Sequence, residues 1–151
     1  MRTLWPGTPG VRKWWADSIR DDLLNKPFHS YIKIVDTESA DAHGKPRLVA
    51  YAKWDMSTIE ERGARLNSER WRVMGDRKRY YLDSLVTHPD YRRLGLGARL
   101  VKCGCDLADK YGVGLYVEAR KAAAPLYAKY GFVDESDPGA AESSSMARRA
   151  Q

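Results

Sequence analysis

Apolar residues recur at intervals of three and four, the spacing of one helical face, in three stretches of the chain. The first is residues 11–25 (VRKWWADSIRDDLLN), which Pro27 brings to an end. The second, residues 96–111, follows a glycine-rich turn. The third, residues 122–130 (AAAPLYAKY), is shorter, and Gly131 can close it in the left-handed conformation. The pattern predicts one helix in each stretch.

Four other stretches have the apolar and β-branched character of strands. Residues 28–35 (FHSYIKIV) and 48–54 (LVAYAKW) are joined by a polar segment in which His43-Gly44 fits a hairpin turn, so we expect them to pair antiparallel. Residues 80–87 (YYLDSLVT) and 114–119 (GLYVEA) flank the second predicted helix. We expect the charged residues 55–78 to form an exposed, partly helical insert. The small and polar residues 134–151 are expected to form an exposed or partly disordered tail.

Composition adds limits to this picture. The 151 residues suit one domain, and the formal net charge of +6 favours an anionic partner such as nucleic acid, a membrane surface or a phosphorylated cofactor. No apolar run approaches the roughly 20 residues of a membrane span, and residues 1–10 lack the order of a secretory signal, so we expect a soluble, cytoplasmic protein. Cys103 and Cys105 are two apart on a predicted helix and point away from each other, which indicates structural thiols rather than a metal or disulfide pair.

Residues 87–101 (THPDYRRLGLGARLV) place two arginines and two glycines between a predicted strand and a predicted helix. A helix N-terminus presents unpaired N–H groups and a partial positive charge, and glycines let a phosphate approach those groups. Arg92 and Arg93 would add charge-assisted hydrogen bonds. Neither the Walker loop nor the dinucleotide fingerprint occurs here. The turn is therefore a candidate pyrophosphate site, with an ordinary capped turn as the alternative.

A wider pattern contains this turn. The run YLDSLVTHPDYRRLGLGARLV, followed by GLYVEA and APLYAKYGF, resembles the GNAT superfamily of acyl-CoA-dependent N-acyltransferases, particularly its small fungal-type members. The resemblance covers residues 47–133 and rests on three motifs in order. It implies an α+β fold with a mixed, twisted, mostly antiparallel sheet flanked by helices. It also implies a single domain, residues 1–151, in which the N-terminal part (1–46) lacks the usual first strand. The two C-terminal strands would be shortened to residues 132–134 and 145–148.

Acetyl-CoA is the cosubstrate that the resemblance implies. Its pantetheine arm would lie between the strand of residues 80–87 and that of residues 114–119, with the pyrophosphate in the glycine-rich turn. The helix of residues 122–130 would close the thioester end. The cofactor-binding residues would be Leu85, Val86, Thr87, Arg92, Arg93, Leu94, Gly95, Leu96, Gly97, Ala98 and Tyr127.

Acetyl transfer to an amine needs proton removal, a stabilised oxyanion and a proton for the departing thiolate. Tyr127 matches the family's tyrosine in its LYxKxGF motif and is the candidate acid, with a packed aromatic as the alternative. Asp83 lies two residues before Leu85, is expected on the same strand face, and is the first candidate base. Recognition of a substrate ammonium or a salt bridge are its alternatives. Glu118, on the neighbouring strand, is the second candidate base, and the sequence does not choose between them.

The resemblance therefore implies N-acetylation of an amine by direct attack, without a covalent enzyme intermediate. Aromatic residues favour a small aromatic or hydrophobic amine over an extended protein lysine. Arg120 and Lys121 add positive charge near the thioester end, which suits an acidic substrate or simply keeps the loop solvated. A non-catalytic acyl-CoA-binding module, or the same scaffold used for other small-molecule chemistry, is the alternative.

Other partners follow from charge and from the sheet edge. Acidic residues interrupt the basic ones in residues 55–78, which disfavours nucleic-acid binding, and no membrane role is expected. The absent first strand would leave an open sheet edge, which predicts a homodimer.

Overall fold

A six-stranded sheet runs through the middle of the protein in the order β1-β2-β3-β4-β6-β5. The computed structural model describes residues 8–57, 68–75, 77–139 and 142–151. All neighbouring strands pair antiparallel except β3 and β4, which are parallel. The strands are β1 (His29–Ala40), β2 (Pro46–Asp55), β3 (Arg79–Thr87), β4 (Gly114–Arg120), β5 (Val133–Asp134) and β6 (Ser143–Arg148).

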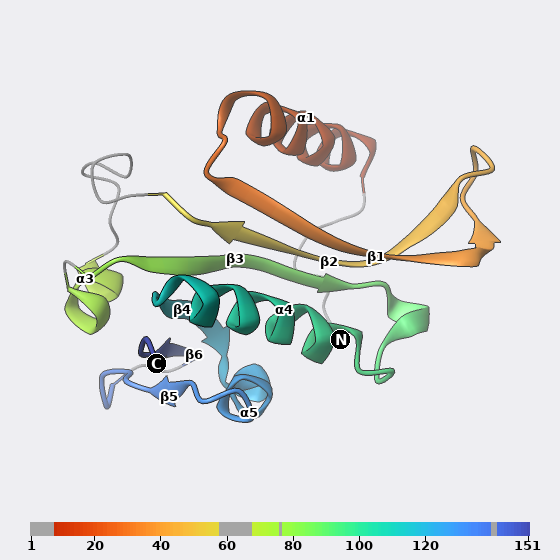
Figure 1. Cartoon of the computed structure of the whole chain (residues 1–151). Coiled ribbons are helices and arrows are strands. Elements are labelled where there is room, and N and C mark those ends of the chain that lie inside the picture. Colours follow the sequence, from red (N-terminus) through yellow and green to blue (C-terminus); the bar gives the residue numbers. More distant parts are fainter. Residues whose placement is uncertain (1–7, 58–67, 76, 140–141) are drawn as a thin grey trace.

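Helices lie on both faces of the sheet (Figure 1). α1 (Pro9–Asn25) lies on one face, and α4 (Leu96–Tyr111) with α5 (Ala124–Ala128) lies on the other. We call these the α1 face and the α4 face. Short 3₁₀ turns, η2 (Pro89–Tyr91) and η3 (Lys121–Ala123), precede α4 and α5. Among the described residues, no helix is both long and apolar enough to cross a membrane.

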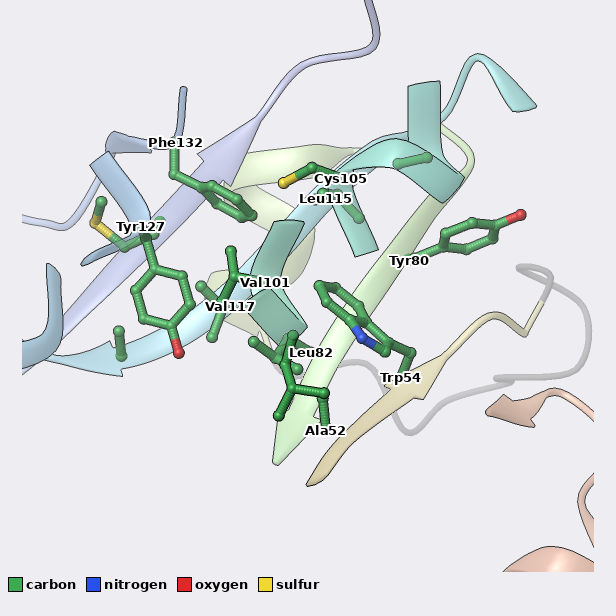
Figure 2. Close-up of a cluster of buried hydrophobic side chains, with 14 of the residues drawn as sticks. Ala52, Trp54, Tyr80, Leu82, Val101, Cys105, Leu115, Val117, Tyr127 and Phe132 are labelled. Carbon is green, nitrogen blue, oxygen red and sulfur yellow. The ribbon is translucent and has the colours of Figure 1, made fainter. Parts of the chain in front are cut away.

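The larger hydrophobic core fills the space between the sheet and the helices of the α4 face (Figure 2). Trp54 of β2 is fully buried there. Its ring lies so close to α4 that a Cβ on Gly104 would be 2.0 Å from its Cζ2 atom. α4 can therefore approach β2 only because residue 104 has no side chain.

A smaller apolar cluster lies on the opposite side of β4. α3 (Ser68–Met74) contributes Val73 and Met74, which pack against Tyr116 of β4 and Ala147 of β6. The sequence predicted an exposed, partly helical insert for residues 55–78. That prediction was wrong for Val73 and Met74, because the last turn of α3 covers the sheet. Residues 58–67 and 76 lie outside the described part of the chain.

The C-terminal segment also differs from its prediction. The sequence predicted an exposed or partly disordered tail for residues 134–151, in which residues 145–148 could form a shortened strand. Residues 143–148 form β6 between β4 and β5, and five of its six residues are buried. β6 pairs with β4 along its whole length, from Leu115↔Arg148 to Arg120↔Ser143. The stretch is rich in serine and has little strand character by itself, so its position depends on pairing with residues far away in sequence. β5, by contrast, is as short as predicted.

The other predicted elements were found with small changes in length. The helix of residues 96–111 has the predicted bounds, and α1 and the first two strands are longer than predicted. The predicted helix of residues 122–130 is divided into η3 and the five-residue α5. Gly131 adopts the expected left-handed conformation, with φ of +81°. No strand precedes α1 in the described residues, so β1 lies at the edge of the sheet.

Candidate active site

The parallel strands β3 and β4 separate shortly after they begin. They pair only from Arg79↔Gly114 to Tyr81↔Tyr116. Beyond that point β3 is paired with β2 alone, and β4 with β6 alone. The β4-facing edge of residues 82–87 therefore has no strand partner in the described residues. This edge includes the predicted pantetheine contacts Leu85, Val86 and Thr87.

The glycine-rich turn lies at the end of β3, at the open end of this separation. Arg93 has φ of +67° and Gly95 has φ of +77°, and Arg93 is the only non-glycine residue with positive φ in the described chain. Gly95 caps α4 without a side-chain hydrogen bond, and the first helical bond runs from Arg99 N–H to its carbonyl. Within the described residues, the N–H groups of the preceding positions, Leu96, Gly97 and Ala98, donate to no acceptor. The turn thus has the geometry of an anion site. Arg92, Arg93 and Leu94 are all exposed beside it.

Gly97 occupies a special position in that turn. A Cβ there would lie 3.8 Å from Leu85, 3.9 Å from Leu126 and 3.9 Å from the Thr87 hydroxyl, which are ordinary contact distances. The protein's own packing therefore tolerates a side chain at residue 97. The Cα hydrogen of Gly97 that a side chain would replace faces the space between the end of β3 and α5.

A β-bulge places Asp83 differently from the prediction. Lys53 pairs with Ser84 and Trp54 with Leu82, so Asp83 is the extra residue of β3. The bulge reverses the alternation of side chains. Leu85 packs into the core of the α4 face, whereas Asp83 forms an ion pair with Lys53 on the α1 face. The expectation that Asp83 and Leu85 share one strand face was wrong.

Asp83 belongs to a network that the sequence did not predict. Its partner Lys53 lies 3.1 Å from Asp83 Oδ2 and 2.7 Å from Oδ2 of Asp22, a buried carboxylate of α1. Lys26 and the hydroxyl of Tyr31 also donate to Asp22, at 2.8 and 2.7 Å. Burial by itself raises the pKa of Asp22, but the hydrogen bonds from Lys26, Lys53 and Tyr31 outweigh it and hold that pKa well below its usual range. Asp22 therefore stays ionised and fixes Lys53 beside Asp83.

Glu118 lies on the same face as Asp83. Val117 and Ala119, its neighbours on β4, belong to the core of the α4 face, so strand alternation turns Glu118 to the other side. The hydroxyl of Tyr116 lies 3.5 Å from Glu118 Oε1. Burial raises the pKa of Tyr81 to about 12, and the negative charges of Glu118 and Asp83 contribute to that rise, opposed by Arg70. The structure therefore brings both candidate bases to the α1 face.

Tyr127 approaches from the opposite face. It is 5% exposed, its ring contacts Phe132 edge-on at 5.6 Å, and Figure 2 shows its hydroxyl end directed away from Phe132. No hydrogen bond to this hydroxyl is found among the described residues, and it is not one of their fully buried unpaired atoms. Burial raises the pKa of Tyr127 to about 12, so the phenol stays protonated at neutral pH.

An open cavity of about 560 Å³ lies on the α1 face where β3 and β4 separate. Both strands contribute to it, and so do α1 and β2. Its lining residues are Trp15, Tyr51, Asp83, Ser84, Leu85, Val86 and Arg120. The site therefore combines a turn with unpaired N–H groups at one end, a phenol on one face, and a cavity with a carboxylate on the other.

Comparison with known proteins decides the family. Residues 8–132 match the family model described as the acetyltransferase (GNAT) family. The chain belongs to this family. Its α+β fold, with the mostly antiparallel sheet flanked by helices, is the GNAT fold that the sequence predicted. No curated protein matches this GNAT sequence significantly.

Solved structures show the same fold at low sequence identity. One is a histone acetyltransferase HPA2 and related acetyltransferase from Corynebacterium glutamicum, with TM-score 0.64 and 22% identity, over 97% of this chain and 79% of that one. Another is Arabidopsis thaliana NAA60 with a bisubstrate analogue, with TM-score 0.63 and 17% identity, over 95% and 94% of the two chains. NAA60 has also been solved in complex with acetyl-CoA, with TM-score 0.55 and 17% identity, over 86% and 80%.

Proposed function

We propose that this GNAT protein transfers the acetyl group of acetyl-CoA to the amine of a small molecule in the cytoplasm. The observation that carries the proposal is the separation of β3 and β4, with the glycine-rich turn at its open end. An extended chain that ends in a pyrophosphate fits this arrangement. The unpaired edge of β3 can form hydrogen bonds with its amides, and the unpaired N–H groups of the helix can form hydrogen bonds with its phosphates. The family membership and the NAA60 complex with acetyl-CoA support the same cosubstrate.

The turn would hold the pyrophosphate on the N–H groups of Leu96, Gly97 and Ala98. Arg92 and Arg93 would add charge-assisted hydrogen bonds from the exposed side. The pantetheine amides would bond to the free edge of β3 at residues 85–87. The thioester would then lie between β3 and β4, with Tyr127 on one side and the carboxylates of the α1 face on the other.

The chemical step would be a direct attack. The amine lone pair adds to the thioester carbonyl carbon, the tetrahedral intermediate collapses as the C–S bond breaks, and the amide and CoA thiol are the products. Tyr127 is the proposed proton donor to sulfur. Because burial raises the pKa of Tyr127 to about 12, the phenol keeps its proton at neutral pH and is available as the donor.

Asp83 is the better supported of the two candidate bases. It lines the cavity, and its side chain is 39% exposed, whereas Glu118 does not line the cavity. Lys53 holds Oδ2 of Asp83 and leaves Oδ1 for the proton of the attacking amine, directly or through a water molecule. Glu118 is the alternative base.

Calorimetry with acetyl-CoA tests the cofactor site. An Arg92→Ala, Arg93→Ala double variant should bind acetyl-CoA at least tenfold more weakly, since each charge-assisted hydrogen bond contributes about 1.5 to 3 kcal/mol. A Lys78→Ala, Lys110→Ala variant removes the same charge at the far ends of β3 and α4 from the turn and should bind within about twofold of the parent. Equal affinities of the parent and the arginine variant for acetyl-CoA would contradict the assignment of the pyrophosphate to this turn.

A further inference from the structure

The cavity on the α1 face has walls of two kinds. Trp15 of α1 and Tyr51 of β2 are half-buried aromatic side chains, and Val86 adds an apolar one. Asp83 and Arg120 are charged and come from opposite sides of the separation between β3 and β4. A molecule in this cavity would therefore contact an aromatic wall and charges of both signs.

The negative charges near the cavity have partners within the protein. Asp83 is paired with Lys53, and Lys53 with Asp22, which Lys26 also contacts. Within these four residues the formal charges cancel. Glu118, further along the same face, contacts the hydroxyl of Tyr116.

Arg120 differs from these groups. Its side chain makes no ion pair or hydrogen bond within the part of the chain that the structure describes, although it lines the cavity. A guanidinium keeps its charge at all accessible pH values and binds carboxylates with paired donors. It is therefore available to an anionic group of a bound molecule.

The strand register gives the offset between the two residues along the strand direction. Starting from the last pair, Tyr81↔Tyr116, Asp83 is two residues further along β3, and Arg120 is four residues further along β4. Both strands run in the same direction. Arg120 thus lies about two residues, or roughly 7 Å, beyond Asp83 along the sheet, toward the open end.

We propose that the acceptor is an aromatic amine that carries a carboxylate or a similar anion about one ring length from its nitrogen. The amine would lie at Asp83, the ring against Trp15 and Tyr51, and the anion at Arg120. This inference rests on the proposed acetyl transfer and adds the substrate class.

Two probe amines of nearly equal shape test the proposal. 4-(Aminomethyl)benzoate carries a carboxylate across the ring from its aminomethyl group, and 4-methylbenzylamine carries a methyl group there instead. With acetyl-CoA as donor and release of the CoA thiol as readout, kcat/KM should be at least tenfold higher for the carboxylate. In an Arg120→Gln variant the ratio of the two kcat/KM values should fall toward one. In a Lys121→Gln variant, which removes an exposed neighbouring charge outside the cavity lining, the ratio should stay as in the parent.

Three results would overturn the inference. The first is an equal kcat/KM for both amines in the parent. The second is an Arg120→Gln variant that binds acetyl-CoA more weakly by calorimetry and loses activity with both amines equally, which would assign Arg120 to the cofactor. The third is failure of both amines to react, or to bind the CoA complex by calorimetry, while other amines are acetylated. Failure of every amine and of acetyl-CoA binding would instead contradict the proposed function itself.

Discussion

Asp22 is the residue on which the arrangement of the α1 face depends. Its carboxylate is buried, and it is contacted by Lys26, directly after α1, by the Tyr31 hydroxyl of β1 and by Lys53 of β2. A carboxylate in such a position is stable only when it is paired, and here the pairing also fixes Lys53 beside Asp83. Asp22 thus positions the candidate base Asp83 through Lys53.

An Asp22→Asn variant should lose stability, because Lys53 and Lys26 lose their shared counter-charge in a largely buried place. We expect a loss of about 3 kcal/mol in the free energy of unfolding at pH 7, measured by urea denaturation. The pKa of Asp22 is lowered on folding, so its contribution is fully present above the unfolded value of about 4 and is lost as the pH falls further. The difference in the free energy of unfolding between parent and variant should therefore become smaller as the pH falls below about 4. A difference that is the same at pH 7 and at about pH 3 would contradict this role.

Tyr127→Phe keeps the ring and its contact with Phe132 but removes the hydroxyl. If the phenol protonates sulfur, kcat should fall by about 10² to 10⁴, while acetyl-CoA affinity and thermal stability stay near those of the parent. Burial raises the pKa of Tyr127 to about 12, so the phenol loses its proton only at very alkaline pH. In the parent, deprotonation of Tyr127 should therefore cause no fall in kcat below about pH 11. If the variant has the same kcat as the parent, Tyr127 is not the proton donor, and its role is to pack against Phe132.

At the scale of elements, α4 carries two glycines with different functions. Gly104 faces Trp54 and allows the helix to approach β2, whereas Gly97 faces the space between β3 and α5. One glycine serves packing, and the other serves the proposed cofactor site.

The same substitution at both positions separates these functions. Gly104→Ala should destabilise the protein by about 1 to 3 kcal/mol, because the new methyl overlaps the Trp54 ring. Gly97→Ala should leave stability unchanged or raise it by up to about 1 kcal/mol, since alanine is the better helix former. It should nevertheless weaken acetyl-CoA binding several-fold by crowding the turn. Thermal denaturation and calorimetry on both variants measure the two effects, and unaltered affinity in Gly97→Ala would contradict a phosphate close to residue 97.

The elements that the sequence predicted well have strong local signals. The bounds of α4 follow from Gly95 and Gly112, which both take the left-handed conformation, and from the apolar face between them. For β6 the sequence predicted no more than a short strand at residues 145–148 within an exposed tail, because serines give no apolar alternation and only the pairing with β4 and β5 buries them. The bulge at Asp83 likewise has no local signal, because it is defined by the register of β2 against β3.

The site was predictable to a similar extent. The positions of the glycine-rich turn and Tyr127 followed from motifs, while the network of Asp22 did not. In the sequence, Asp22 is one of two adjacent aspartates in the first predicted helix, a pattern that is typical of solvent-exposed residues. Its burial results from Tyr31 and Lys53, which are near it only in the folded chain.

At the scale of the whole molecule, β1 lies at one edge of the sheet and is 12 residues long. Register irregularities follow Ile34 and Asp36, which leaves residues 29–34 as the regular part of that edge. An exposed regular edge can pair with a second copy, so we expect a homodimer through β1. Light scattering should give twice the monomer mass at high micromolar concentration, and Lys33→Pro, which removes an N–H and breaks the edge, should restore the monomer. A monomeric parent protein would remove this prediction.

The most direct measurement of the central claim is acetyl transfer itself. The protein is incubated with acetyl-CoA and a panel of small amines, and both the free CoA thiol and the mass of each amine are followed. The account predicts that at least one amine gains one acetyl group, that one CoA thiol appears for each acetyl group transferred, and that Tyr127→Phe slows both together. Tight binding of acetyl-CoA with no acetylated amine in the whole panel would contradict it and would identify the protein as a non-catalytic acyl-CoA-binding module.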